Sequence, residues 1–358
     1  MEENINHGVI EQEPQGFDWI AGAETGIAFI ERMPAANWEK FLSDPELQKS
    51  SKTDFMDCVT QSFLNELEAQ FNWMAFVGAF TAEQIHWLTR QGYLIGGKFN
   101  FSKRFTAKMS GTTIQGNSAQ NVGNSARHDG LLPESDWPVT ADMSWAEHYA
   151  EIPQALKDKA KKILEIVEIA YEFVYIKGAL GCQEAIKKHI KQAPLQILAP
   201  VCSPWNTTEI IKSCGKAAAE HATTIYKFED LKVFNDFDHY NPVLKRLDWD
   251  YYIPYVVKGV VSIKKEAVIP TKLLHEFTTT LKYGQNAPEI TLLQDALKLD
   301  GDMSLKVPST GYYGNITAQA VMGFQRKHNV ADEAEIVALQ GRQVGPKTRA
   351  KLNDLFNK

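Results

Sequence analysis

A run of regularly spaced apolar residues begins shortly after residue 58 and predicts a helix. Four of them fall on one helical face: Phe63, Leu67, Phe71 and Met74. Asp54 and Asp57 stand just before this run, and either carboxylate is expected to cap the free backbone amides of the first turn. The pattern therefore places Cys58 at or near the start of an amphipathic helix with a buried apolar face.

Further along the chain, the pattern changes from helices to strands. Helices are expected in three segments, residues 81–88, 153–178 and 178–187. After the proline at 194 the spacing becomes that of strands, which are expected at residues 195–199, 221–228, 231–234 and 249–263. Residues 1–50 carry aromatic anchors between polar turns and predict an extended arm that packs on the following domain.

Composition narrows the classes of function. The 358 residues, with a mass of 40.3 kDa and 44% hydrophobic content, are enough for a full core and two domains. The net charge of -6 and the lack of a long basic run give no electrostatic reason to expect nucleic acid as a partner. The polar N-terminus and the absence of a long apolar run predict neither a signal peptide nor a membrane partner.

The chain has four cysteines: Cys58, Cys182, Cys202 and Cys214. This number is too small for a disulfide framework in a chain of this length. If Cys58 is a free nucleophile, Cys202 and Cys214 are the pair to test first for a bridge, although we expect both to be reduced and buried.

Cys58 is the candidate nucleophile because of its place on the predicted helix. The positive end of a helix dipole favours the thiolate, which is the form that attacks carbonyl carbons. The alternative is a packed and inert cysteine, since cysteine is among the most buried residue types.

Two later segments add histidine and asparagine in the order that papain-like cysteine peptidases use. His221 opens the strand expected at 221–228, and Asn235 follows the strand expected at 231–234. With the Cys58 helix, these segments resemble the catalytic elements of that family. The resemblance implies an α+β fold with a helical lobe and a β-sheet lobe, and a hydrolase of peptide or protein substrates that needs no cofactor.

The resemblance also implies a role for each residue. Cys58 is the nucleophile, His221 forms an ion pair with it and later protonates the leaving amine, and Asn235 orients the imidazole ring. Asp236 is the alternative third residue, because side chains alternate along a strand and only one of the two can face His221.

Gln48 is the residue that the resemblance assigns to the oxyanion hole, where its amide and a backbone N–H would hold the developing negative charge. The family usually has this glutamine six residues before the cysteine, where this chain has Lys52. Gln48 can serve only if the intervening loop bulges. The resemblance further implies that Gly116, Asn117 and Ser118 contact the substrate backbone; a helix-capping turn is the alternative use of such residues.

The C-terminal part resembles a three-helix peptidoglycan-binding domain. Its motifs are Leu293-Gln294, Gly311-Tyr312-Tyr313-Gly314 followed by Thr317, Phe324-Gln325, and Val344-Gly345 followed by Thr348. Each glycine permits a tight turn and each threonine can brace the next helix. The acidic insert at residues 331–335 departs from the pattern and is expected to lengthen a loop.

The sequence thus predicts three parts: a papain-like domain with its N-terminal capping arm at residues 1–265, a linker at 266–286, and the peptidoglycan-binding domain at 287–358. Peptidoglycan is the expected partner. A wall-binding domain without a signal peptide favours a bacteriophage or prophage product, associated with the virion or released at the cell wall.

Other functions remain as alternatives or are excluded. An NlpC/P60-like endopeptidase fits the Asp57-Cys58 pair, but its histidine follows its cysteine more closely than His221 follows Cys58. A catalytically inactive virion or cell-surface binding protein is the alternative from another class. No metal site is expected, because Asp300-Gly301-Asp302 begins like a calcium loop but position 311 is glycine where the closing glutamate would stand.

Overall fold

The computed structural model describes residues 8–15, 18–21, 27–46, 48–202, 205, 210–234, 244–264, 275–303, 307 and 309–356. The chain forms two compact units, Met1–Ala267 and Val268–Lys358. The first unit is α+β and the second is mainly helical, as the sequence predicts.

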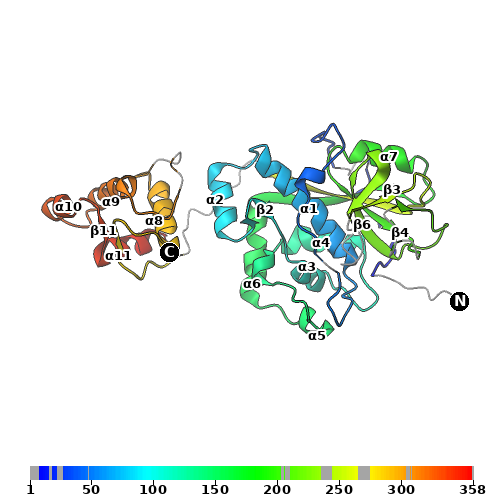
Figure 1. The fold of residues 1–358 in the computed structure, drawn as a ribbon, viewed down its shortest axis with the longest axis horizontal. Coiled ribbons are helices and arrows are strands. Elements are labelled where there is room, and N and C mark those ends of the chain that lie inside the picture. Colours follow the sequence, from blue (N-terminus) through cyan, green and yellow to red (C-terminus); the bar gives the residue numbers. More distant parts are fainter. Residues whose placement is uncertain are drawn as a thin grey trace. The chain divides into compact units, whose positions relative to one another are not determined.

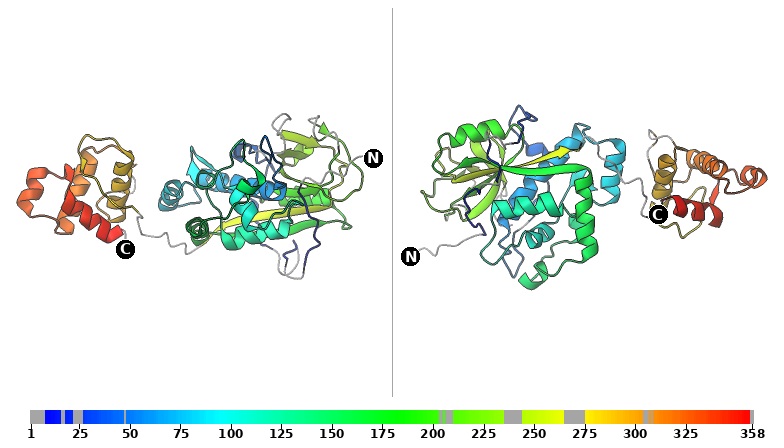
Figure 2. Two further views of the ribbon diagram at one scale, coloured as in Figure 1. Left: turned by 90° about the horizontal axis from the view of Figure 1, so that it is seen from below. Right: turned by 180° about the vertical axis from the view of Figure 1, so that it is seen from behind.

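The first unit is built around helix α1, Cys58–Phe76, which is buried along most of its length. The described residues of this unit form six further α-helices: α2 (Ala82–Arg90), α3 (Lys103–Met109), α4 (Ala119–Asp129), α5 (Trp145–His148), α6 (Gln154–Lys161) and α7 (Cys182–His189). Helix α1 contacts α3 and α4 as well as β6 (His221–Lys227) and β9 (Tyr255–Ile263) of the sheet, and α4, with α6 packed on it, also contacts β3 (Val167–Ile176) (Figures 1 and 2). The nucleophile candidate thus starts a helix that lies between a helical layer and a sheet.

The main sheet of this unit has the strand order β3-β9-β4-β6-β7-β8-β5 among the described residues. Its strands are β3 (Val167–Ile176), β4 (Leu195–Ala199), β5 (Ile210–Ile211), β6 (His221–Lys227), β7 (Lys232–Phe234), β8 (Leu244–Leu247) and β9 (Tyr255–Ile263). A separate hairpin pairs β1 (Leu94–Ile95) with β2 (Lys98–Phe99). In the main sheet, β6 lies between β4 and β7, with Ala199 opposite His221 and Phe234 opposite Thr224. This register places His221 at one end of a central strand.

The helix expected at residues 153–178 is wrong in its second half. Helix α6 and a short 3-10 turn, Lys162–Glu165, end before Val167, and β3 follows as a strand paired along β9. Here β-branched and aromatic residues dominate, and their stiff side chains favour a pleated strand over a helix. The spacing of the apolar residues fits both a helix and a strand, so the pairing with β9 decided that this segment is a strand.

Several other predictions from the pattern are confirmed. Helix α2 begins as expected: the side chain of Thr81 accepts the N–H of Gln84, and the Gln84 side chain accepts the N–H of Thr81. The N-terminal arm packs on the first unit, where the indole N–H of Trp38 donates to the carbonyl of Ile190 at 2.7 Å. Ile20 of the same arm forms a bridge with Phe173 on β3.

Cys202 and Cys214 form a disulfide, so the expectation that both are reduced is wrong. The pair itself is the one that the sequence singled out. The bridge joins the end of β4 to the segment before β6, and the hydroxyl of Tyr251 lies 3.2 Å from the Cys214 sulfur. The covalent link therefore ties together the chain on both sides of Trp205, which lies against His221.

The second unit contains α8 (Pro288–Leu299), α9 (Asn315–Lys327), α10 (Glu333–Leu339) and α11 (Pro346–Phe356), with β10 (Leu281–Lys282) paired to β11 (Gln343–Val344). The motif residues of the sequence pair with one another: Gln294 donates to the Thr317 hydroxyl at 2.9 Å, and Gln325 donates to the Thr348 hydroxyl at 3.0 Å. The same buried glutamine-to-threonine bond thus occurs twice, from α8 to α9 and from α9 to α11.

Two predictions for this unit need correction. The segment 266–286 is not a linker throughout, because Phe277 and Leu281 lie in the core of the second unit; residues 266–274 are outside the described part. The acidic insert does not form a longer loop. It starts α10, with the Asp332 side chain accepting the N–H of Glu335 as an N-cap. The three predicted helices are therefore joined by a short fourth.

In the part of the chain that the structure describes, no helix combines the length and the apolar character needed to cross a membrane.

Candidate active site

Cys58 is the first residue of α1, and only 2% of its surface is exposed. The prediction that Asp54 or Asp57 caps the start of α1 is wrong. Asp57 precedes the helix, but its side chain makes no capping bond and instead lies 3.2 Å from Nε2 of His148, with both side chains fully buried. Asp54 Oδ1 accepts the N–H of Met56 at 2.9 Å rather than an N–H of α1. The two carboxylates therefore contact His148 and the N–H of Met56 and do not cap α1.

Cys58 and His221 line the same small, narrow pocket. Gln48 forms another part of its wall, and Phe234 at the end of β7 completes it. His221 is 4% exposed, and its ring meets the Trp205 ring edge to face at 5.6 Å between centroids. The fold thus brings Gln48 and Cys58 together with His221, which is far from both in the sequence.

Buried side-chain hydrogen bonds hold the first turns of α1 against the sheet. Gln196 on β4 donates to the carbonyl of Val59 at 2.8 Å and to the Ser62 hydroxyl at 2.7 Å. The Thr224 hydroxyl on β6 donates to the carbonyl of Ser62 at 2.9 Å. Because β6 begins at His221, these bonds set the distance between the thiol and the imidazole. Sequence reasoning missed Gln196, although a polar residue within an apolar strand was the available signal.

The environment of Cys58 favours the thiol over the thiolate. Burial raises the pKa of the Cys58 thiol above its ordinary value, and the nearby carboxylates of Asp54 and Asp57 raise it further. Backbone N–H groups of Ala222 and Val59 near the sulfur act in the opposite direction but do not outweigh burial. The expectation that the helix start favours the thiolate is therefore wrong for this resting arrangement.

The loop before α1 carries Gln48 into the pocket. Lys49 and Asp54 form an antiparallel bridge, so the residues between them bulge outward as a tight hairpin. Lys52 at its tip is exposed and donates to the carbonyl of Asp142 at 3.2 Å. The Gln48 amide donates to Asp54 Oδ1 at 2.7 Å. The bulge that the sequence required for Gln48 is present, and Lys52 at the usual glutamine position faces away from the pocket.

Asn235 and Asp236 lie outside the described residues, so their roles remain predictions from the sequence. The residue before them, Phe234, lines the pocket, and its carbonyl accepts the Thr223 hydroxyl at 2.6 Å.

Gly116, Asn117 and Ser118 lie against the chain's own N-terminal arm. The N–H of Asn117 donates to the carbonyl of Gly8 at 2.9 Å, and the carbonyl of Asn117 accepts the N–H of Ile10 at 2.8 Å. Ser118 caps α4 by accepting the N–H of Asn121 at 3.3 Å. The helix-capping alternative therefore describes Ser118, and contact of these residues with a substrate remains a prediction.

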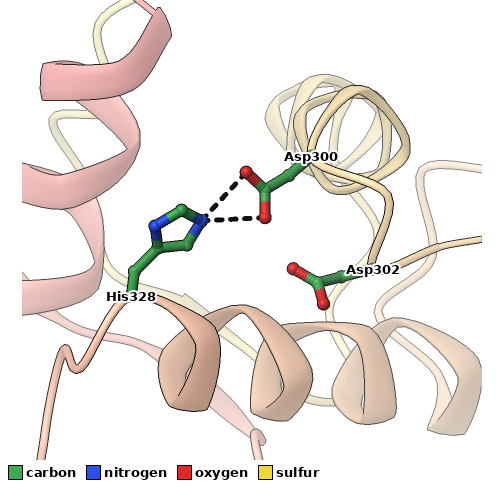
Figure 3. A group of neighbouring side chains, drawn as sticks. All are labelled: Asp300, Asp302 and His328. Atoms are coloured by element: carbon green, nitrogen blue, oxygen red, sulfur yellow. Dashed lines mark hydrogen bonds and ion pairs between the residues drawn. The ribbon is translucent and has the colours of Figure 1, made fainter.

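A second group of titratable side chains lies in the C-terminal unit. Figure 3 shows the ring of His328 facing the carboxylate of Asp300, with Asp302 beside it. Nε2 of His328 lies 2.9 Å from both Asp300 oxygens, and the Lys327 ammonium lies 2.9 Å from Oδ2. Burial and the adjacent Asp300 raise the pKa of Asp302 to about 6. The sequence missed His328 as the neighbour of this pair, and Lys327 already supplies a cationic partner for Asp300.

The second unit also has a recognisable sequence. Residues 286–333 match the family model of a putative peptidoglycan binding domain. The matched segment includes α8 and α9 and the hydrogen bond between Gln294 and Thr317. The match confirms the resemblance drawn for this part of the chain.

Solved structures similar to the chain include three cysteine proteases. Xylellain from Xylella fastidiosa is 13% identical, with a TM-score of 0.45, and the match covers 73% of this chain and 96% of that one. Digestive procathepsin L 3 of Tenebrio molitor is 10% identical, with a TM-score of 0.45 and coverage of 72% and 76%. Amb a 11, a ragweed pollen allergen in its proform, is 14% identical, with a TM-score of 0.42. That match covers 63% of this chain and 65%, just under two thirds, of the other. The comparison with curated proteins gave no match.

Proposed function

We propose that the chain is a papain-like cysteine peptidase that hydrolyses peptide bonds with Cys58 and His221, and that its C-terminal unit directs it to the bacterial cell wall. The observation that carries the proposal is the shared pocket, where the first residue of α1 meets the first residue of β6. The order of cysteine, histidine and asparagine along the sequence supports the same conclusion.

The chemistry follows from these residue types. The His221 imidazole takes the thiol proton as the Cys58 sulfur attacks the carbonyl carbon of the scissile bond. His221 then gives that proton to the departing amine, and a thioester remains on Cys58. Water, losing a proton to His221, attacks the thioester, which releases the carboxylic acid and restores the thiol. Asn235 is proposed to hold the imidazole in the required orientation.

Two donors suit the oxyanion that forms in each step. The first N–H groups of a helix have no partner within it, so the backbone N–H of Cys58 at the start of α1 is one donor. The Gln48 amide on the pocket wall is the other. In the resting chain this amide donates to Asp54, which holds it beside the pocket.

The experiment uses purified sacculi and denatured protein as parallel substrates. We expect the full chain to co-sediment with sacculi and to cut at least one of the two substrates. Cys58→Ala should still co-sediment while losing about 10³-fold or more of the activity. A chain ending before residue 275 should keep activity on a soluble peptide but no longer co-sediment. Undiminished hydrolysis by Cys58→Ala would refute the peptidase, and failure of the full chain to co-sediment would refute wall anchoring.

Gln48→Ala is expected to lower kcat by about 10²-fold, because one oxyanion donor is lost. Lys52→Ala is the matched control from the same hairpin. It should leave kcat unchanged, since Lys52 is exposed and faces Asp142. Initial rates at saturating peptide measure the difference. Equal losses of kcat for both variants would show that the hairpin matters for the folded structure and that Gln48 is not an oxyanion donor.

A non-catalytic binding protein is the second candidate, and the burial of Cys58 together with its raised pKa favours it. A peptidyl chloromethyl ketone separates the two candidates. It should alkylate Cys58 in an active peptidase, with mass spectrometry locating the adduct, and it should leave Cys58 unmodified in a binding protein. The phage or prophage origin stays a prediction from the sequence.

A further inference from the structure

His148 is a buried titratable side chain that the proposed mechanism does not use. It ends the short helix α5, and none of its side chain is exposed. Its Nε2 lies 3.2 Å from Oδ2 of Asp57, the residue directly before the nucleophile, whose side chain is equally buried. No other described residue forms a hydrogen bond with either oxygen of Asp57. His148 is therefore the contact that determines where this carboxylate points.

The His148 ring is held in place from two directions. It stacks on the Phe55 ring, with 3.9 Å between the centroids and 10° between the planes. Nε of Arg104 donates to the His148 carbonyl at 3.0 Å, which fixes the backbone of this residue. The hydroxyl of the next residue, Tyr149, donates to the carbonyl of Phe55 at 2.6 Å. These contacts tie the end of α5 to the segment that leads into Cys58, so packing sets the position of Nε2.

Asp57 occupies the N-cap position of α1, where an aspartate side chain usually accepts an N–H from the first turn. In this structure it makes no such bond. One N–H that an N-cap side chain can accept, that of Val59, lies instead near the Cys58 sulfur, where it acts to lower the thiol pKa. An N–H that donates to the Asp57 carboxylate would stabilise a thiolate less, because two anions would share one donor. The contact with His148 removes that competitor.

We propose that His148 is a positioning residue for the nucleophile: it keeps the Asp57 carboxylate off the N-cap of α1 and so leaves the first N–H groups of the helix to the Cys58 sulfur. The proposal rests on the proposed peptidase function and adds a residue that acts through Asp57 and touches no substrate. It requires a proton on Nε2 of His148, because a carboxylate can only accept. Nδ1 has no hydrogen-bond partner among the described residues, so Asp57 alone selects this tautomer.

Other charged and titratable groups surround the pair. Those that act on His148 or Asp57, besides Cys58, are Glu46, Asp54, Lys103, Arg104 and Tyr149. Burial lowers the pKa of His148 against the opposing effect of Asp57, and Lys103 and Arg104 lower it further. The neutral ring is therefore the form expected at neutral pH. His148 contributes a hydrogen bond to Asp57 and not a full positive charge.

The test measures the pH dependence of Cys58 alkylation by iodoacetamide, which reports the thiolate and needs no peptidase activity. Mass spectrometry follows the Cys58 adduct, since Cys182 is also a free thiol. His148→Phe keeps a ring on Phe55 but removes the donor. We expect the released Asp57 carboxylate to cap α1 and alkylation to slow about tenfold, which moves the pH profile up by about one unit. His148→Gln, whose amide can still donate to Asp57, should stay within about twofold of the wild type.

The double variant His148→Phe/Asp57→Ala separates this role from a purely structural one. It lacks both the donor and the competing carboxylate, so its alkylation rate should return at least to that of the wild type. A double variant as slow as His148→Phe would overturn the proposal, and so would an unchanged pH profile for His148→Phe.

A measurement on the wild type keeps the proposal testable if His148→Phe does not fold. The ring-nitrogen NMR shifts of His148, assigned by their absence from His148→Gln, should show a proton on Nε2. A proton on Nδ1 alone would overturn the proposal, because Nε2 could then not donate to Asp57.

Peptide hydrolysis by the same variants separates this proposal from the peptidase itself. We expect kcat/KM to follow the alkylation rates. If the alkylation contrast holds while no variant hydrolyses a peptide, the role of His148 stands and the peptidase fails. If every variant hydrolyses the peptide and alkylates as the wild type does, the peptidase stands and the role of His148 is overturned.

Discussion

Replacing His221 with alanine is expected to lower kcat/KM on a peptide substrate by about 10³-fold or more at neutral pH. Among the described residues that line the pocket with Cys58, His221 alone carries an imidazole that can take up the thiol proton. Burial, Asp54 and Asp57 raise the pKa of the Cys58 thiol, so without a base very little thiolate forms. The loss of activity in His221→Ala therefore arises mainly because no base removes the thiol proton, in addition to the missing ion pair.

The pH dependence of kcat/KM for His221→Ala is a second test of this role. Because the thiol pKa lies above its ordinary value, the thiolate fraction of His221→Ala should still be rising through pH 10. The deficit relative to the wild type is expected to shrink over that range. His128→Ala, an exposed histidine near the end of α4, is the control and should keep full activity. A His221→Ala enzyme with wild-type kcat/KM would remove His221 from the mechanism.

Asn235→Ala is expected to reduce turnover by about 10²-fold or more, whereas Asp236→Ala should change it little. A neutral amide can orient the His221 ring without placing a further negative charge beside it, as a carboxylate would. The imidazolium then remains a good acid for the leaving amine near neutrality. The third residue follows Phe234, whose place on the pocket wall puts the end of β7 at the site.

Steady-state rates of the two variants, measured under the same conditions, decide between the residues. A large loss for Asp236→Ala with a small one for Asn235→Ala would move the role to the aspartate. Mild and equal losses would show that neither residue orients His221. Circular dichroism melting curves serve as the control, since a shared loss of stability would lower both rates together.

The hydrophobic pattern predicted the site elements well where one period was clear. Helix α1 begins at Cys58, and β6 begins at His221, as expected. It failed at β3, where apolar residues fit both a helix and a strand and only the partner strand β9 decided between them. The same limit applies to Gln48. Spacing from Cys58 argued against it, but spacing does not show how a hairpin folds.

The net electrostatic effect on Cys58 could not be read from the sequence, although Asp57 beside it already favours a higher thiol pKa. The position of Cys58 at a helix start predicts a lowered thiol pKa, because the dipole acts on the residue locally. In the structure, burial and two carboxylates raise the thiol pKa instead. Asp57 is paired with His148, and Asp54 accepts the amide of Gln48. Those partners follow from packing between distant segments, and no pattern along the chain reports them.

The sequence by itself determined the order of cysteine, histidine and asparagine and the motifs of the C-terminal unit. Such features depend on residue type and on neighbours in the chain, so they can be read directly. Only the tertiary structure decided that Gln48 reaches the pocket, that the Cys58 thiol is buried, and that the N-terminal arm lies on Asn117. Each of these depends on contacts between segments far apart in sequence, whose energies are settled by packing and desolvation in the folded chain.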